Sequence, residues 1–240
     1  MKKKILSVCL VAVIAVMAIA GASLAYLTDT DGEDNVFTVG NVRIDLAENF
    51  DEDLAHLIPA TGSAQNGTLQ NGIQKEVFIT NTDSEEAYVR VHIAVPEILD
   101  NGDPDFDAGS NVLHFNYSGD NVGAGKWDWS NAAGAPYEGS WNYYETTIDG
   151  IAYNVYVVTY ETALESQVST VSAMTQVYLD SKVTNEDITA IKAVLDDNWH
   201  IYVAAEGVQA TGFANAYDAL DTAFGTPGSY DVEWVIDTNN

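Results

Sequence analysis

The chain has 240 residues, with 36 acidic side chains against nine basic ones and a formal net charge of −27 at neutral pH. This charge argues against nucleic acid as a partner, because binding requires phosphates to be neutralised, and against docking on anionic lipid. The single cysteine, Cys9, excludes a disulfide within the chain, so stability has to come from a hydrophobic core. A chain of this length is compatible with one such core.

The first 25 residues have the pattern of a secretory signal peptide. Three lysines at positions 2–4 precede an apolar run, residues 5–20, and small side chains follow at Ser23 and Ala25. These are the positive, hydrophobic and cleavage-site regions of such a signal, in the expected order. The apolar run is too short and wrongly flanked for a membrane span.

Cleavage between Ala25 and Tyr26 would leave a single secreted domain, residues 26–240. The three lysines of the signal are then lost, which leaves six basic residues and a net charge of −30. We therefore expect a secreted protein, released from the cell or held at its surface, with no membrane attachment after processing. An uncleaved N-terminal anchor is the alternative.

Strand-like patterns dominate the chain from residue 37 to residue 129. An acidic turn at 28–35 precedes a strand at 37–46 that bends at Gly40. A second strand around 77–79 turns at 81–84, and the clearest alternation follows at 87–95, where Pro96 ends it. Short strands are expected at 112–117 and 126–129.

The second half continues this pattern and adds two helices. Strands are predicted at 151–160, 168–180, 199–209 and 230–236. One helix follows Thr184, whose pairing with Asp187 predicts a capping box. The other helix covers 212–224 and ends at Gly225. About eight strands with glycine-rich turns predict a mainly β protein, a jelly-roll-like β-sandwich with two short helices.

Three parts of the sequence resemble the TasA/camelysin family of secreted bacterial biofilm-matrix proteins. The first is AYLTD at 25–29 with NVFTVGNV at 35–42, the second is the segment 75–96, and the third is AAEGVQA at 204–210 with the helix end at 223–225. The middle, residues 99–166, shows no such similarity.

The resemblance implies a jelly-roll sandwich, processing by a dedicated signal peptidase of the SipW type and a structural role in the biofilm matrix. In that family the freed N-terminal segment pairs with a neighbouring subunit and builds fibres. Carried over, Tyr26, Leu27, Thr28 and Asp29 would belong to the donated segment. The partners would be other copies or related matrix subunits. An extended peptide that joins a sheet edge gains main-chain hydrogen bonds and places alternate side chains in pockets.

The camelysin branch of the family is described as metallopeptidase-like, so zinc has to be considered. The four histidines, His56, His92, His114 and His200, are scattered, and no HExxH motif occurs. We interpret them as histidines that lie at the surface or have their hydrogen bonds satisfied. We expect the protein to bind no metal or cofactor and to have no enzymatic activity. A zinc site assembled from distant residues stays open as the alternative.

Two acidic segments are candidates for calcium-binding loops. Residues 29–33 resemble the opening of such a loop, but the glycine comes too early and position twelve is Gly40. Asp103, Asp105 and Asp107 alternate, yet His114 occupies the matching twelfth position. We interpret both as solvated loops, with calcium as the weaker alternative.

A second class of function comes from the aromatic residues of the middle region. Trp127, Trp129 and Trp141 would form a carbohydrate-binding platform if they were exposed. If they were buried, they would belong to the core, which is the preferred interpretation because aromatic side chains dominate core energetics.

Overall fold

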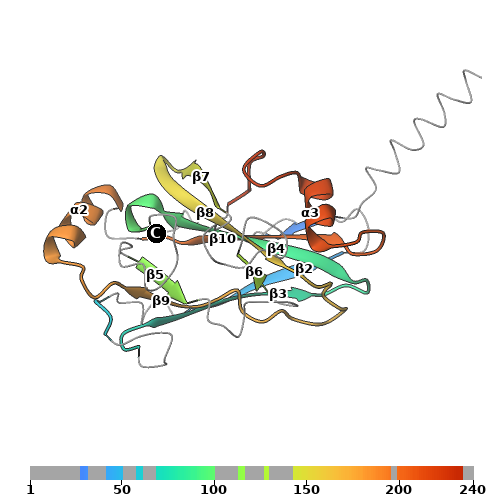
Figure 1. Ribbon diagram of the computed structural model, residues 1–240, viewed down its shortest axis with the longest axis horizontal. Coiled ribbons are helices and arrows are strands. Elements are labelled where there is room, and N and C mark those ends of the chain that lie inside the picture. The colour runs from blue at the N-terminus through green and yellow to red at the C-terminus, as the bar shows by residue number, and fades with distance from the viewer. Residues whose placement is uncertain are drawn as a thin grey trace, which may run out of the picture.

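The computed structural model describes residues 28–31, 42–50, 58–61, 69–100, 113–116, 127–129, 143–195 and 199–234. These residues form two antiparallel β-sheets that pack face to face, with two α-helices beside them (Figure 1). The predicted mainly β sandwich with two helices is confirmed. The predicted signal peptide and the cleavage site at Ala25 and Tyr26 lie outside the described residues.

In the described part of the chain, the larger sheet, here sheet A, contains six strands. From one margin inward they are β1 (Thr28–Asp31), β10 (Tyr202–Gln209), β4 (Ala87–Pro96) and β8 (Ile151–Tyr160). Two further strands, β6 (Trp127–Asp128) and β7 (Tyr143–Ile148), both pair with β8 and form the other margin. All these pairs are antiparallel. The strand β4 begins at Ala87 and ends at Pro96, as the alternation predicts.

Sheet B has four strands among the described residues. Their order is β2 (Ile44–Phe50), β3 (Ile73–Asn81), β9 (Met174–Leu179) and β5 (Leu113–Asn116). Asn81 is buried where β3 turns toward β4, and its side-chain amide donates to the carbonyl oxygens of Glu85 (2.7 Å) and Leu164 (3.0 Å). This asparagine therefore fixes the turn that brings the chain from sheet B to sheet A.

The main core lies between the sheets and consists of the inward-facing residues of both. Val89, Val91 and Ile93 of β4 are fully buried there, as are Val77 and Ile79 of β3. Close approach of the sheets requires a glycine at one point. A Cβ at Gly207 of β10 would lie 2.8 Å from Cγ2 of Ile44 in β2, so a larger residue would require the Ile44 side chain to shift.

The helices cover different parts of the sandwich. The helix α2 (Asn185–Leu195) buries Ile191 and Leu195 in the main core. Its predicted capping box is confirmed, since Thr184 N donates to Asp187 Oδ2 and Asp187 N donates to Thr184 Oγ1. The helix α3 (Ala216–Phe224) lies on the outer face of sheet A and ends at Gly225, as predicted (Figure 1). A short 3₁₀ helix, η2 (Glu97–Leu99), follows β4.

Several predicted boundaries were wrong. The acidic segment Thr28–Asp31 is a strand rather than a turn, because β10 offers it a hydrogen-bonding partner. The strand β7 was not predicted, although the Asp-Gly turn after it, with both φ angles positive, is a strong hairpin signal. The predicted final strand is also wrong for residues 230–234, which pack across sheet A without pairing.

Three further boundaries move inward by three to six residues. The helix α3 begins at Ala216 rather than at position 212, because Asn215 caps it by accepting a hydrogen bond from Asp218 N. The strands β9 and β10 begin at Met174 and Tyr202 rather than at positions 168 and 199, because the residues before them are irregular. The expected bend at Gly40 lies outside the described residues.

Candidate functional site

The N-terminal strand β1 lies at the margin of sheet A and pairs with β10. The register places Thr28 opposite Val208, Asp29 opposite Gly207, Thr30 opposite Glu206 and Asp31 opposite Ala205. In the described part of the chain no strand lies beyond β1 (blue in Figure 1). Thr28 and Asp29, two of the four residues predicted for strand donation, therefore lie in a strand at a sheet edge. Tyr26 and Leu27 lie outside the described residues.

The strand β10, which pairs with β1, also contacts β4, sheet B and the helix α3. Along its length it pairs with β4, from Tyr202 opposite Ala94 to Gln209 opposite Ala87. On its inner face Gly207 contacts sheet B. On its outer face Val208 packs under α3 with Ala216, Ala219 and Leu220. Removal of β1 would thus leave a strand that is still paired and packed.

A buried ion pair occupies the outer face of β4 and β10. Arg90 and Glu206 lie directly opposite each other in the register, and their side chains are 2 % and 4 % exposed. Arg90 Nε donates to Glu206 Oε2, and its two terminal nitrogens donate to Asp221 Oδ1 of α3 (2.8 Å) and to the Gly225 carbonyl oxygen (3.1 Å). One guanidinium therefore connects two strands with the C-terminal end of α3.

The segment after α3, residues 225–234, crosses the same face, and we call it the C-terminal strap. The Tyr230 hydroxyl donates to Glu206 Oε1 (2.8 Å) and accepts from Arg90 Nη2 (2.8 Å). Farther along, Trp234 packs against Tyr202 with ring centroids 6.4 Å apart. The strap is therefore fastened to β10 by one polar and one aromatic contact.

His92 and Tyr144 complete this polar network on the side of β7. His92 is fully buried, and its Nε2 lies 3.2 Å from Glu206 Oε2. The rings of Tyr144 and Tyr230 lie edge-on to the imidazole, with centroids 6.2 and 6.4 Å away. Both oxygens of the buried Glu206 carboxylate and all three nitrogens of the Arg90 guanidinium thus have a partner inside the protein, as buried charges require.

The electrostatics of the network favour a charged Glu206 beside neutral tyrosines. Burial by itself would raise the pKa of Glu206, but the hydrogen bond from His92 and the charge of Arg90 outweigh it, so the pKa lies below its usual value. Burial raises the pKa of Tyr144, and the nearby Glu206 carboxylate adds to this. Burial also raises the pKa of Tyr230. The ion pair therefore persists across the neutral range.

Sequence reasoning missed this network, because its members come from β4, β10, α3 and the C-terminal strap. Arg90 and Glu206 are 116 positions apart in the chain. The available signal was that an arginine and a histidine occupy alternate positions of the most apolar strand. The network is too deeply buried to reach a substrate, and we interpret it as the structure that holds the strap and α3 on β10.

The tryptophans proposed for carbohydrate binding do not form an exposed platform. Trp127 and Trp129 are fully buried in the core between the sheets, and Trp127 Nε1 donates to the Val171 carbonyl oxygen. Their rings pack against Tyr160 and Tyr156, with centroids 5.1 and 6.0 Å apart. The preferred core interpretation is confirmed for these two residues. Trp141 lies outside the described residues.

Metal binding gains no support from the residues that the structure describes. Among them, no group of three or more histidine, cysteine, aspartate or glutamate side chains is placed to hold an ion. His200 stacks on Tyr202 with centroids 5.7 Å apart, and His92 belongs to the network above. For calcium, Asp29 and Asp31 lie in an extended strand rather than in a loop. Asp103, Asp105, Asp107 and His56 lie outside the described residues.

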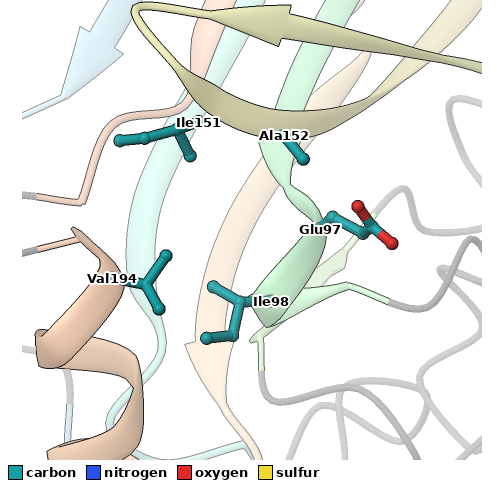
Figure 2. Close-up of a pocket in the computed structure, with 5 residues that line it drawn as sticks. All are labelled: Glu97, Ile98, Ile151, Ala152 and Val194. Carbon is teal, nitrogen blue, oxygen red and sulfur yellow. The ribbon is translucent and has the colours of Figure 1, made fainter.

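A shallow pocket of about 310 Å³ lies between η2, the start of β8 and α2. Figure 2 shows Ile98, Ile151, Ala152 and Val194 around it, with the Glu97 carboxylate pointing away from the apolar side chains. Val194 and Ile98 are 53 % and 37 % exposed. The one ionisable residue of the lining, Glu97, points away from the other side chains, and no set of hydrogen-bond donors faces the pocket, so it does not resemble a catalytic centre.

Comparisons with known proteins do not assign the chain to a family. A scan against protein-family models finds no match, and a search of the curated proteins finds none either. Among the described residues, no helix has both the length and the apolar character that a membrane span requires.

Proposed function

We propose that this chain is a secreted structural subunit of an extracellular, biofilm-type matrix that assembles by exchanging its N-terminal strand between copies. The observation that carries the proposal is the position of β1. Residues Thr28–Asp31 form a short strand at the margin of sheet A, paired antiparallel with β10. The proposed role is non-catalytic, and its partners are other copies or related subunits of the matrix.

The physical basis is that a strand bound to its own domain can bind a neighbour through the same contacts. The main-chain hydrogen bonds between β1 and β10 are equivalent whether β1 comes from the same copy or from the next one. Among the described residues, β1 pairs with β10 at four positions, so its release should cost little compared with unfolding of the sandwich. The strand β10 keeps its pairing with β4 and its cover by α3, and is therefore ready to receive a replacement.

Cleavage of the signal peptide would couple this strand exchange to secretion. Before cleavage, the segment that includes Tyr26 and Leu27 stays joined to the apolar run at residues 5–20. Cleavage at Ala25 frees it, so a signal peptidase would control when assembly begins. Copies with a net charge of −30 repel each other, so salt, divalent cations or mild acid should promote assembly by screening or neutralising carboxylates.

Electron microscopy of the processed chain, with and without salt and calcium, tests the proposal. Protein that begins at Tyr26 is expected to form filaments, and a variant lacking residues 26–31 is expected to form none. Circular dichroism of the shortened variant shows whether the sandwich still folds. A synthetic peptide of residues 26–31 should stop filament growth of the parent by occupying β10. Equal filament formation with and without residues 26–31 would contradict the proposal.

A further inference from the structure

Within the described residues, the margin of sheet A opposite β1 contains a second strand with an unpaired edge. The strand β7 (Tyr143–Ile148) pairs with β8 on one side only, and within the described residues no strand lies on its other side. It has no lysine, no proline and no shift in its register, and Glu145 is its one charged residue, so it carries few of the features by which proteins protect such edges. Figure 1 shows the β7–β8 hairpin in yellow at the border of the molecule.

The turn of this hairpin determines which backbone groups are available. Asp149 and Gly150 have φ angles of 53° and 84°, which makes them a two-residue turn of type I′. In such a hairpin the flanking pair, Ile148 and Ile151, is hydrogen-bonded, and hydrogen-bonded and non-hydrogen-bonded pairs then alternate along the strands. The N–H and C=O groups of Tyr143, Glu145 and Thr147 therefore point away from β8.

The charge on β7 determines which kind of strand can pair with it favourably. Glu145 is the only charged residue of β7, and it is exposed. A strand like β1, with two aspartates in four residues, would bring further carboxylates toward Glu145. A strand with few charges and many threonine and aromatic residues fits better, and β7 itself has that composition.

We propose that β7 pairs antiparallel with β7 of a second copy, across a two-fold axis that passes through Thr146. This symmetry places Thr146 opposite Thr146 of the second copy, Glu145 opposite Thr147 and Tyr144 opposite Ile148. Threonine pairs and aromatic–β-branched pairs are favourable across antiparallel strands. An axis through Glu145 would instead place two glutamates opposite each other, which is unfavourable in a chain that is already strongly acidic. The interface joins two sheets edge to edge and does not use β1.

Cysteine cross-linking tests both the interface and its register. Replacement of Cys9, the only native cysteine, by serine gives a background without thiols. In the proposed register, two copies of Thr146→Cys form a non-hydrogen-bonded pair with Cα atoms about 4.5 Å apart, within the range of a disulfide. Under mild oxidation this variant is expected to form a covalent dimer.

Two neighbouring positions provide matched controls. Glu145→Cys and Thr147→Cys each lie diagonally across from their own counterpart, at about 7–8 Å, and should cross-link about tenfold more slowly than Thr146→Cys. An equal mixture of these two variants should cross-link readily, because positions 145 and 147 face each other. A Thr147→Pro change removes one outward N–H and should reduce the cross-linking of Thr146→Cys.

The result does not depend on strand donation, because the same cross-linking is expected from a chain that lacks residues 26–31. A folded Thr146→Cys variant that stays monomeric under oxidation would overturn the proposal. Cross-linking of Glu145→Cys alone that is as fast as that of Thr146→Cys would overturn it too.

Discussion

Along β4, the two faces of sheet A are both buried but chemically different. On the inner face, Val89, Val91 and Ile93 of β4 pack against sheet B, and all three are fully buried. On the outer face, Arg90 and His92 of the same strand are 2 % and 0 % exposed beneath α3 and the C-terminal strap. The alternation of β4 therefore reports the polarity of each face and not its exposure, because segments far away in the sequence cover the polar side.

The difference also concerns how stability is distributed. The inner face gains its stability from many small contacts, and no single methyl group is decisive. The outer face concentrates several charge-assisted hydrogen bonds on Arg90 and Glu206. Loss of one member leaves the others buried without a counter-charge, which is far more costly than loss of the whole pair. The outer face should therefore be the more fragile one.

The largest effect is expected from Arg90→Ala. This change leaves Glu206 buried without its main partner and frees the carbonyl oxygen of Gly225, so the free energy of unfolding should fall by about 3–5 kcal/mol. Ile93→Val, on the inner face of the same strand, is the matched control and should cost only about 0.5–1.5 kcal/mol. Urea unfolding followed by tryptophan fluorescence measures both. Equal losses from the two variants would show that the outer face is no more fragile than the inner one.

The strands that the sequence predicted well are those whose pattern is local. The alternation of β4 and its end at Pro96 match the structure, as does the end of α3 at Gly225. The strand β7 was missed because its sequence, YYETTI, does not alternate between apolar and polar residues. Its turn at Asp149 and Gly150 was the better signal.

The candidate site was only partly predictable, because its contacts join distant parts of the chain. Family resemblance pointed to Thr28 and Asp29, yet the aspartates around them favour a turn over a strand. Only the pairing with β10, some 180 positions later, makes the segment extended. The contact between Arg90 and Tyr230 spans 140 positions and follows from no local pattern.

A second, smaller effect should depend on pH. The folded state lowers the pKa of Glu206 below its ordinary value of 4.5, so its ionised form stabilises the protein above that pH. This contribution is lost as the pH falls through the lowered pKa. Glu206→Gln keeps much of the hydrogen bonding and should cost less than Arg90→Ala at neutral pH. The difference in unfolding free energy between parent and variant should then shrink as the pH falls from about one unit above 4.5 through the lowered pKa.

The many surface carboxylates titrate over the same range, but they are shared by both proteins and cancel in this difference. Unfolding curves of the two proteins at matched ionic strength provide the measurement. A difference that stays constant down to the acid limit would mean that Glu206 does not carry the charge assigned to it.

The smallest of the three effects concerns the C-terminal strap. Tyr230→Phe removes the hydroxyl that donates to Glu206 and accepts from Arg90, but keeps the ring, whose centroid lies 6.0 Å from Arg90 Cζ. A hydrogen bond to a charged group contributes about 1.5–3 kcal/mol, so the loss should fall in that range. Because Tyr230 lies in the strap, hydrogen exchange of residues 225–234 should accelerate more than that of β4. Uniform acceleration across both segments would mean that the hydroxyl stabilises the whole outer face and not the strap in particular.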